Sequence, residues 1–234
     1  RLATPLPEAA PLVSILLPFR NQPDLLRQCL DGILARSGCY PRFEVLGVDN
    51  RSDCGETRAL MAHYAALDPR VRFLSHDAPF NYAAINNRAA DQAQDIGAVG
   101  ACLYFADDTV QHAGCVVGVY GTVGHWCKLQ PRLGPAERDW LHVPRNVSAV
   151  TGACLMVRKS LYQAVGGLDE ATFGVGYNDV DFCLKLLARG YRNVVTPYCE
   201  AYHHESKTRG RDVTPEARER RDRETEAFQA RYAA

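Results

Sequence analysis

Residues 13–50 read VSILLPFRNQPDLLRQCLDGILARSGCYPRFEVLGVDN, and their pattern decides the fold class. The apolar run at 13–17 predicts a strand, and Pro23–Leu34 predicts a helix because its apolar residues recur on one face. Phe43–Val48 is a second apolar run, and it ends in Asp49 and Asn50. A strand, a helix and a strand in this order form a β-α-β unit, in which the two strands lie parallel.

The same alternation continues along the chain, with a helix near Glu56–Ala66, a strand at Val71–Leu74, a helix at Asn81–Gln94 and a strand at Ala98–Phe105. We therefore expect an α/β protein with a Rossmann-like, mostly parallel sheet flanked by helices, in a single domain. Ligands of such sheets bind beyond the carboxyl ends of the strands. Asp49 lies at such an end.

Composition disfavours several function classes, nucleic-acid binding among them. The chain has 27 Lys and Arg residues and 27 Asp and Glu residues, so we expect no general attraction to nucleic acid. Its nine cysteines are scattered and form no CxxC pair. We expect them to be small buried residues in a reducing compartment, and not disulfides or a zinc site. No stretch of about 18 apolar residues and no signal peptide is visible, so we expect a cytoplasmic protein.

Several nucleotide and nucleophile motifs are missing. The sequence contains no GxGxxG after a strand and no GxxxxGK[ST], which excludes a standard dinucleotide site and a P-loop. It also contains no GxSxG nucleophile elbow. Phosphate binding must therefore depend on a metal ion or on isolated side chains.

The segment Asn178-Asp179-Val180-Asp181 begins a helix predicted for Asp179–Arg189. Capping alone can explain these residues: with Asn178 as the N-cap, Asp181 takes the third helical position and resembles the acidic half of a capping box. Asp179 is less needed for capping. The helix dipole favours its ionised form, which suits a general base. Both interpretations, capping and catalysis, stay open from the sequence alone.

The charged stretch Ala217–Tyr232 follows Thr214 and Pro215, which are typical of a helix start. It predicts a solvated C-terminal helix.

An ordered set of segments between about Val13 and Arg209 resembles the family 2 glycosyltransferases that build O-antigen and other surface polysaccharides. In order, the segments are VSILLPFRNQPDLLRQCL, FEVLGVDNRSD, FNYAAINN, AVGACLYFADDTVQHAG, VSAVTGACLMVR, GYNDVDFCLKLLARGYR and TPYCEAYHHES. The resemblance implies a GT-A fold, a nucleotide-diphosphate sugar donor, a glycan or lipid-linked acceptor, and inversion at the anomeric carbon.

The resemblance also assigns roles to single residues. Asp179 matches the general base that takes the proton of the acceptor hydroxyl, and Asp181 is expected to orient the acceptor or only to cap its helix. Asp49 matches the acid that contacts the base or ribose of the donor. The other residues expected at the donor are Pro18, Asn50, Asn81, Asn86 and Asn87.

A divalent metal ion, Mn²⁺ or Mg²⁺, is implied as well, with His203 as one ligand. At one place the relatives carry a further strand, an acidic metal motif and a helix, which typical element lengths put at about thirty residues. In this chain Gln94 runs almost directly into Gly97 at that place. Aligned on residues 111–114, FADDT matches a later family segment. Aligned on NYAAINN, Asp107 and Asp108 fall near the metal motif, and we expect them to serve as ligands.

We therefore predict an inverting hexosyl- or deoxyhexosyltransferase, with residues 1–12 as an extension, 13–208 as the transferase domain and 209–234 as a charged helix. The alternative is a catalytically weak or inactive module that binds a sugar nucleotide or glycan, since the metal strand is missing. The resemblance places the growing glycan at the inner face of the membrane, so peripheral membrane association is compatible with either function.

Overall fold

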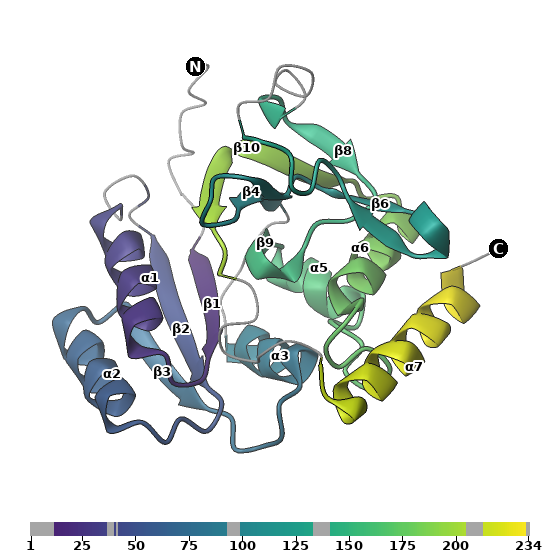
Figure 1. Ribbon diagram of the computed structural model, residues 1–234. Coiled ribbons are helices and arrows are strands. Elements are labelled where there is room, and N and C mark those ends of the chain that lie inside the picture. Colours follow the sequence, from purple (N-terminus) through teal and green to yellow (C-terminus); the bar gives the residue numbers. More distant parts are fainter. Residues whose placement is uncertain are drawn as a thin grey trace. The chain divides into compact units, whose positions relative to one another are not determined.

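The computed structural model describes residues 12–36, 40, 42–92, 99–132, 141–204 and 213–232 (Figure 1). They form two compact units. The first unit contains the described residues up to Phe80 together with the part of a helix from Ile85 onward. The second contains Asn81–Ala84 and the described residues after Gly97. Strands and helices alternate as predicted, so the α/β class is confirmed.

The sheet of the first unit is entirely parallel. It contains β1 (Val13–Phe19), β2 (Phe43–Asp49) and β3 (Val71–Ser75) in the order β1-β2-β3. Within the described part of the chain β1 is an edge strand, paired with β2 alone. The strand was predicted from the apolar run at 13–17, and it extends through Pro18 to Phe19. An edge strand tolerates proline because its free side needs no N–H donor.

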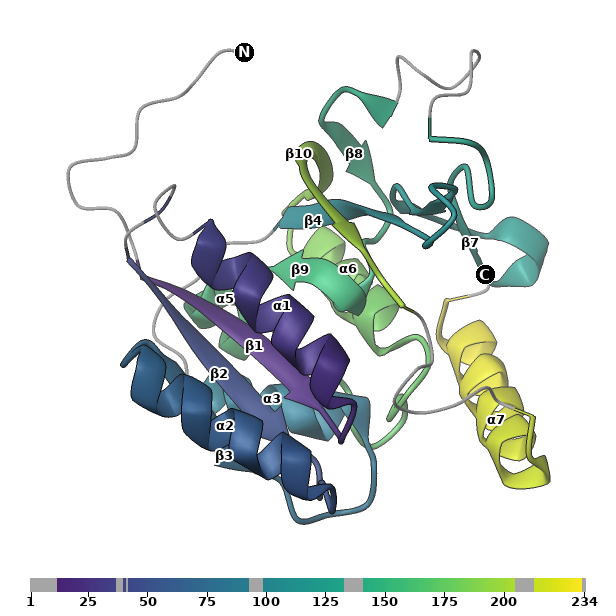
Figure 2. The same ribbon diagram turned by 60° about the vertical axis from the view of Figure 1, so that its left-hand side comes forward.

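Helices cover both faces of this sheet (Figure 2). α1 (Pro23–Ala35) and α2 (Gly55–Leu67) pack on one face, and α3 (Tyr82–Gln92) packs on the other through Ile85. Side chains of a strand alternate between faces, which explains why neighbouring residues of β1 belong to different clusters. The buried residues of the larger cluster are Phe19, Leu26, Leu30, Phe43, Val45, Leu60, Tyr64 and Val71.

α3 begins one residue later than predicted because Asn81 caps it, its Oδ1 accepting the N–H of Ala84 at 2.9 Å. The predicted end of this helix at Gln94 lies outside the described residues, as does the junction between Gln94 and Gly97.

The second unit has a mixed sheet of order β5-β4-β10-β8. β4 and β10 are parallel, and their pairings with β5, β8 and β9 are antiparallel. The mostly parallel arrangement thus holds for the first unit alone. The strands are β4 (Val99–Tyr104), β5 (Val110–His112), β8 (Arg145–Val147), β9 (Leu155–Met156) and β10 (Asn193–Tyr202), with a separate ribbon of β6 (Cys115–Val117) and β7 (Val123–His125).

The helices of the second unit differ in detail from the prediction. The apolar run after Thr151 begins as a 3-10 turn, η3 (Gly152–Cys154), and only then becomes β9; a second such turn, η2 (Val119–Gly121), joins β6 to β7. α5 (Lys159–Ala164) follows β9, and α6 (Asn178–Ala188) lies close to the predicted position of Asp179–Arg189. The N-cap of α6 is Tyr177, with a left-handed φ of 58°, and not Asn178. Asp179 is therefore the second residue of the helix.

The C-terminal helix α7 (Pro215–Tyr232) starts where predicted, with Thr214 Oγ1 accepting the N–H of Ala217 at 3.2 Å. Most of its residues are exposed or half-buried, as a solvated helix requires, but Glu224 and Phe228 are only 6% and 2% exposed, so one face of the helix is buried. α7 belongs to the second unit. The proposed domain limits, 13–208, stay a prediction.

Three of the described cysteines, Cys102, Cys115 and Cys183, are buried free thiols, whereas Cys199 is exposed. Among the helices in the described ranges, none combines the length and the apolar character needed to cross a membrane.

Candidate active site

The Asp179 carboxylate accepts two main-chain N–H groups. Its Oδ2 accepts the N–H of Gly152 at 2.7 Å, and its Oδ1 accepts the N–H of Val180 at 2.8 Å. The residue is half-buried at the start of α6, where the helix dipole favours a negative charge. Both oxygens are thus held by the main chain, while the side chain still reaches the surface.

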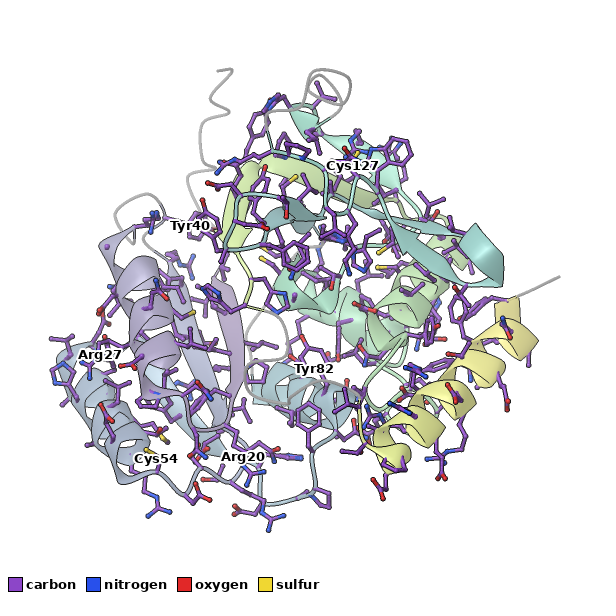
Figure 3. All side chains as sticks on the ribbon, in the orientation of Figure 1. Arg20, Arg27, Tyr40, Cys54, Tyr82 and Cys127 are labelled. Atoms are coloured by element: carbon purple, nitrogen blue, oxygen red, sulfur yellow. The ribbon has the colours of Figure 1, made fainter. Side chains whose placement is uncertain are left out.

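Side chains from two elements, α3 and β5, fix the loop that carries Gly152. Tyr82, at the start of α3 (Figure 3), donates from its hydroxyl to the Gly152 carbonyl at 2.6 Å. The N–H of Thr151 donates to Nε2 of His112 at 3.2 Å. A Cβ on Gly152 would lie 3.3 Å from the Tyr82 ring and 3.4 Å from Cβ of Asp179. Glycine therefore permits this close approach.

His112 is a buried neutral imidazole. Burial, then the neighbouring His125 and Arg145, lower its pKa from 6.5 to about 3. Because Nε2 accepts the Thr151 N–H, the ring proton must be on Nδ1, which lies 3.0 Å from Nδ1 of His125. His112 is thus an acceptor that anchors the Thr151–Gly152 loop.

The structure contradicts the predicted acceptor contact of Asp181, which is 0% exposed. Its Oδ1 accepts hydrogen bonds from Arg231 at 2.8 Å and from the Tyr232 hydroxyl at 2.6 Å, and Lys185 lies 3.0 Å from its Oδ2. Burial and the bond to Asp181 raise the pKa of Tyr232. The capping-box interpretation is also wrong, because the side chain turns toward α7 and not toward the helix start.

The predicted metal ligands Asp107 and Asp108 lie in the turn between β4 and β5. Oδ1 of Asp107 accepts both the N–H and the hydroxyl of Thr109, at 3.0 and 2.7 Å, which holds the pKa of Asp107 below its usual value. Oδ1 of Asp108 accepts the Tyr202 hydroxyl and lies 3.7 Å from Arg132. Each carboxylate already has a partner within the protein.

His203, the third predicted ligand, has its Nδ1 2.8 Å from Oε1 of Gln111. In the described ranges, the one group of three suitable side chains with ligand atoms within 4.8 Å is His112, Cys115 and His125. Asp107, Asp108 and His203 are therefore not brought together, and they do not fit a preformed divalent-cation site.

The histidine and cysteine group does not fit a metal either. Nδ1 of His112 would have to be the ligand atom, but it carries the ring proton as long as Nε2 accepts from Thr151. Burial, and after it the negative charge of Asp179, raise the pKa of the Cys115 thiol, which disfavours the thiolate that metals bind.

In the first unit, the carboxyl ends of β1 and β2 are tied together near Asp49. Oδ1 of Asp49 accepts the N–H of Ser52 at 2.9 Å, and the Ser52 hydroxyl accepts the N–H of Asn21 at 2.7 Å. Asn21 Oδ1 in turn accepts the N–H groups of Asp53 and Cys54, both at 3.1 Å. Asp49 is half-buried at the strand end, where a parallel sheet binds its ligand.

Asn50 is 3% exposed, and its side-chain amide donates to the carbonyls of His76 and Ala78 at 2.9 and 3.0 Å. This arrangement holds the chain after β3 and gives Asn50 a structural role, in place of the predicted donor contact.

The remaining predicted donor residues are half-buried and lie in both units. Pro18 is in β1 opposite Val48, and Asn86 and Asn87 are in the part of α3 that belongs to the first unit. Asn81 belongs to the second unit, where it caps α3 and donates to the Glu170 carbonyl at 3.0 Å.

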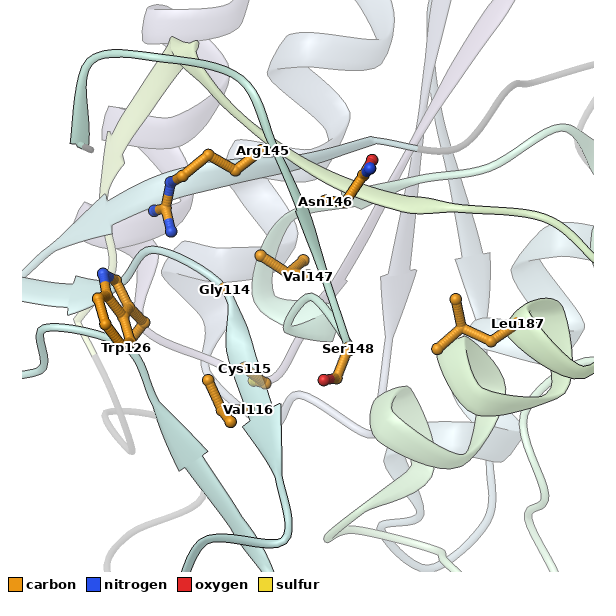
Figure 4. A pocket seen from close by; sticks show the side chains of 9 residues that line it. All are labelled: Gly114, Cys115, Val116, Trp126, Arg145, Asn146, Val147, Ser148 and Leu187. Carbon is orange, nitrogen blue, oxygen red and sulfur yellow. The ribbon is translucent and has the colours of Figure 1, made fainter. Parts of the chain in front are cut away.

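A cavity of about 670 Å³ opens elsewhere in the second unit, with Trp126 and Leu187 on opposite sides (Figure 4). Asp179 does not line it. The lining residues are Gly114, Cys115, Val116, Trp126, Arg145, Asn146, Val147, Ser148 and Leu187.

Sequence reasoning missed the residues that hold Asp179 and Asp181 in place. His112 lies within residues 111–114 and Tyr82 lies within NYAAINN, but neither segment indicated that these side chains hold the Gly152 loop. Nothing in the local sequence pointed to Arg231 or Tyr232, because their partner lies 50 or more residues away.

Comparison with known proteins agrees with this fold. The sequence profile of glycosyl transferase family 2 matches residues 14–113. The uncharacterised protein y4gI of Sinorhizobium fredii is 38% identical over 254 positions, covering 96% of this chain and 28% of that protein. The O-antigen biosynthesis protein RfbC of Myxococcus xanthus is 41% identical over 238 positions, covering 88% of this chain and 18% of that protein.

The chain thus spans less than a third of the length of these two relatives. The alignment with y4gI places about 225 residues of this chain, 96% of 234, on 254 positions, so about 29 positions have no counterpart here. For RfbC, 88% is about 206 residues on 238 positions, so about 32 have none. Both numbers agree in size with the segment of about thirty residues that we expected the chain to lack.

The crystal structure of GalNAc-T7 with UDP, GalNAc and Mn²⁺ superposes with a TM-score of 0.65 at 12% identity, covering 84% of this chain and 44% of that chain. The likeness confirms the GT-A fold.

Proposed function

This chain belongs to glycosyltransferase family 2, and we propose that it transfers a hexosyl or deoxyhexosyl unit from a nucleotide-diphosphate donor to a glycan or lipid-linked acceptor in surface polysaccharide synthesis. The observation that carries the proposal is the Asp179 carboxylate, half-buried at the start of α6 and held by the N–H groups of Gly152 and Val180. RfbC, an O-antigen biosynthesis protein, supports the proposed pathway class.

The reaction is a single displacement with inversion. Asp179 takes the proton of an acceptor hydroxyl, whose oxygen forms a bond to the anomeric carbon of the donor sugar. The bond from that carbon to the diphosphate oxygen breaks, and the nucleoside diphosphate leaves with the electron pair. One carboxylate is sufficient, because a double displacement would require a second group as nucleophile.

Donor binding is assigned to the first unit. Asp49 uses one oxygen for the N–H of Ser52, and we propose that its carboxylate also accepts a hydroxyl of the donor ribose or a base N–H. We propose that Pro18, Asn86 and Asn87 lie next to the bound donor. Asn81 caps α3, the helix that contains Asn86 and Asn87.

The resemblance implies metal dependence, but the predicted ligands of this chain do not form a common site. GalNAc-T7 was crystallised with Mn²⁺, and a divalent cation would offset the charge of the leaving diphosphate. Asp107, Asp108 and His203 do not converge on a common ligand position. Binding of Mn²⁺ or Mg²⁺ therefore stays a prediction.

A second function is favoured by that same observation. With no preformed cation site among the described residues, the chain fits a module that binds a sugar nucleotide or glycan with little or no turnover. In that case Asp179 would accept a hydrogen bond from a glycan hydroxyl without removing its proton.

Titration calorimetry with UDP, dTDP and GDP, each with and without Mn²⁺, separates these functions. For the enzyme we expect one nucleotide to bind in the micromolar range, with at least tenfold tighter binding in Mn²⁺ and transfer of the corresponding sugar to a glycan acceptor. Binding that is indifferent to Mn²⁺, without transfer, supports the module. Absence of binding by all three nucleotides contradicts the enzyme and a module that binds a sugar nucleotide, and leaves only a module that binds a glycan.

A further inference from the structure

The C-terminal helix α7 contacts the segment that leads into Asp179. Glu224, on α7, has a carboxylate that is buried, with the residue 6% exposed. Its Oε1 accepts the N–H of Val175 and its Oε2 accepts the N–H of Gly176, both at 2.9 Å. One carboxylate therefore bridges two consecutive amides, four and three residues before Asp179. Charge-assisted bonds of this kind are stronger than neutral ones.

Glycine at position 176 allows this contact. A Cβ there would lie 3.0 Å from Oε2 of Glu224, which is closer than ordinary packing permits. The Asn178 side chain closes the turn by donating to the Val175 carbonyl at 2.8 Å. The backbone before α6 is thus shaped around the Glu224 carboxylate.

Aromatic packing from α7 supports the next residue. Tyr177 has a φ of 58°, a left-handed conformation that costs an L-residue about 1 kcal/mol. Its ring stacks on Phe228 with centroids 4.7 Å apart and planes at 18°, and its hydroxyl lies 3.2 Å from that of Thr225. Contacts with α7 therefore stabilise the strained residue at the helix start.

The same helix holds the far side of Asp179. Arg231 lies 2.8 Å from Asp181 and 2.9 Å from Asp169, and Tyr232 donates to Asp181 at 2.6 Å. α7 therefore forms hydrogen bonds with the chain on both sides of Asp179, at Val175 and Gly176 before it and at Asp181 after it.

We propose that Glu224 is a positioning residue, through which α7 holds the Val175–Asp181 segment so that Asp179 faces the acceptor. The proposal rests on the proposed function of Asp179 as the base. A misplacement of about 1 Å at a catalytic group can lower a rate by about 100-fold, so even a small shift of this segment matters.

The test compares Glu224→Gln with Glu226→Gln, an exposed residue two positions along the same helix. Glutamine keeps one oxygen acceptor but turns an NH₂ group toward one of the two amides, so that bond is lost. We expect faster hydrogen exchange at Val175 and Gly176, kcat lower by tenfold or more, and a nucleotide Kd within twofold of wild type. Glu226→Gln should change none of these quantities.

Gly176→Ala approaches the same contact from the loop and serves as the second variant, including the case in which Glu224→Gln fails to fold. Faster exchange at these amides with an unchanged kcat in either variant would overturn the positioning role. A wild-type protein that binds nucleotide but transfers no sugar would instead refute the proposed function, and with it the need for a positioned base. The two failures are thus distinguished by the wild-type assay alone.

Discussion

The carboxylate of Asp179 accepts the main-chain N–H of Gly152 at 2.7 Å, although the two residues are 27 positions apart in the sequence. This contact joins the start of α6 to the loop that carries η3. The orientation of the proposed base therefore depends on a loop that His112 and Tyr82 hold in place.

Gly152→Ala should disturb Asp179 directly. The new Cβ would lie 3.3 Å from the Tyr82 ring and 3.4 Å from Cβ of Asp179, so one of them must move. We expect about a tenfold loss of transfer rate with a stability loss of about 1 kcal/mol. Steady-state kinetics and urea unfolding measure both. Gly55→Ala, where a Cβ meets nothing within 4 Å, should leave both unchanged.

His112→Ala should destabilise the second unit. The change leaves a cavity and removes the acceptor of the Thr151 N–H, for a combined loss of about 3 kcal/mol in the free energy of unfolding. In His112→Gln a side-chain oxygen can take the place of Nε2, so we expect a loss of about 1 kcal/mol. Equal losses in the two variants would show that the Thr151 bond does not matter.

Stability should fall in mild acid because of His112. Its pKa is about 3 when folded and 6.5 in a free chain, so the unfolded chain binds more protons between these values. The free energy of unfolding should therefore decrease as pH falls below 6.5, by up to about 1.4 kcal/mol per pH unit from this residue. The difference between wild type and His112→Gln isolates the contribution. A difference that stays constant from pH 7 to pH 4 argues against a buried neutral imidazole.

Asp49 and Asn50 should separate binding from stability. Asp49→Asn keeps an oxygen for the Ser52 N–H and removes the charge, so nucleotide Kd should rise about tenfold with little change in unfolding. Asn50→Ala removes both donors to the carbonyls of His76 and Ala78 and should lower stability by about 2 kcal/mol. A loss of stability in Asp49→Asn together with weaker nucleotide binding in Asn50→Ala would contradict the roles assigned to these two residues.

Local periodicity predicted the first unit well. β1 and β2 follow from continuous apolar runs and α1 from apolar residues at the helical period of 3.6, and each lies within two residues of its predicted limits. Such patterns report which face of an element is buried, and little else.

Contacts between distant segments could not be predicted in this way. The sequence predicted that Asp181 caps its helix or orients the acceptor. Its partners in the structure are Arg231 and Tyr232, and they lie on a helix whose charged sequence indicated a solvated surface. Likewise, Asp107 and Asp108 have the right residue type at a strand end, but Thr109 and Tyr202 bind them in the folded protein. Residue type at the end of a strand indicates a candidate, and the side-chain partners decide its role.

Asp179→Asn tests the central claim most directly. The amide is nearly isosteric with the carboxylate and keeps one oxygen as acceptor, but it cannot take a proton. With a donor and acceptor that the wild-type protein uses, we predict that kcat falls by about 1,000-fold, while the calorimetric Kd for the donor nucleotide stays within about twofold. A variant that transfers sugar at close to the wild-type rate, or one that loses donor binding and transfer to the same extent, would contradict the assignment of Asp179 as the general base.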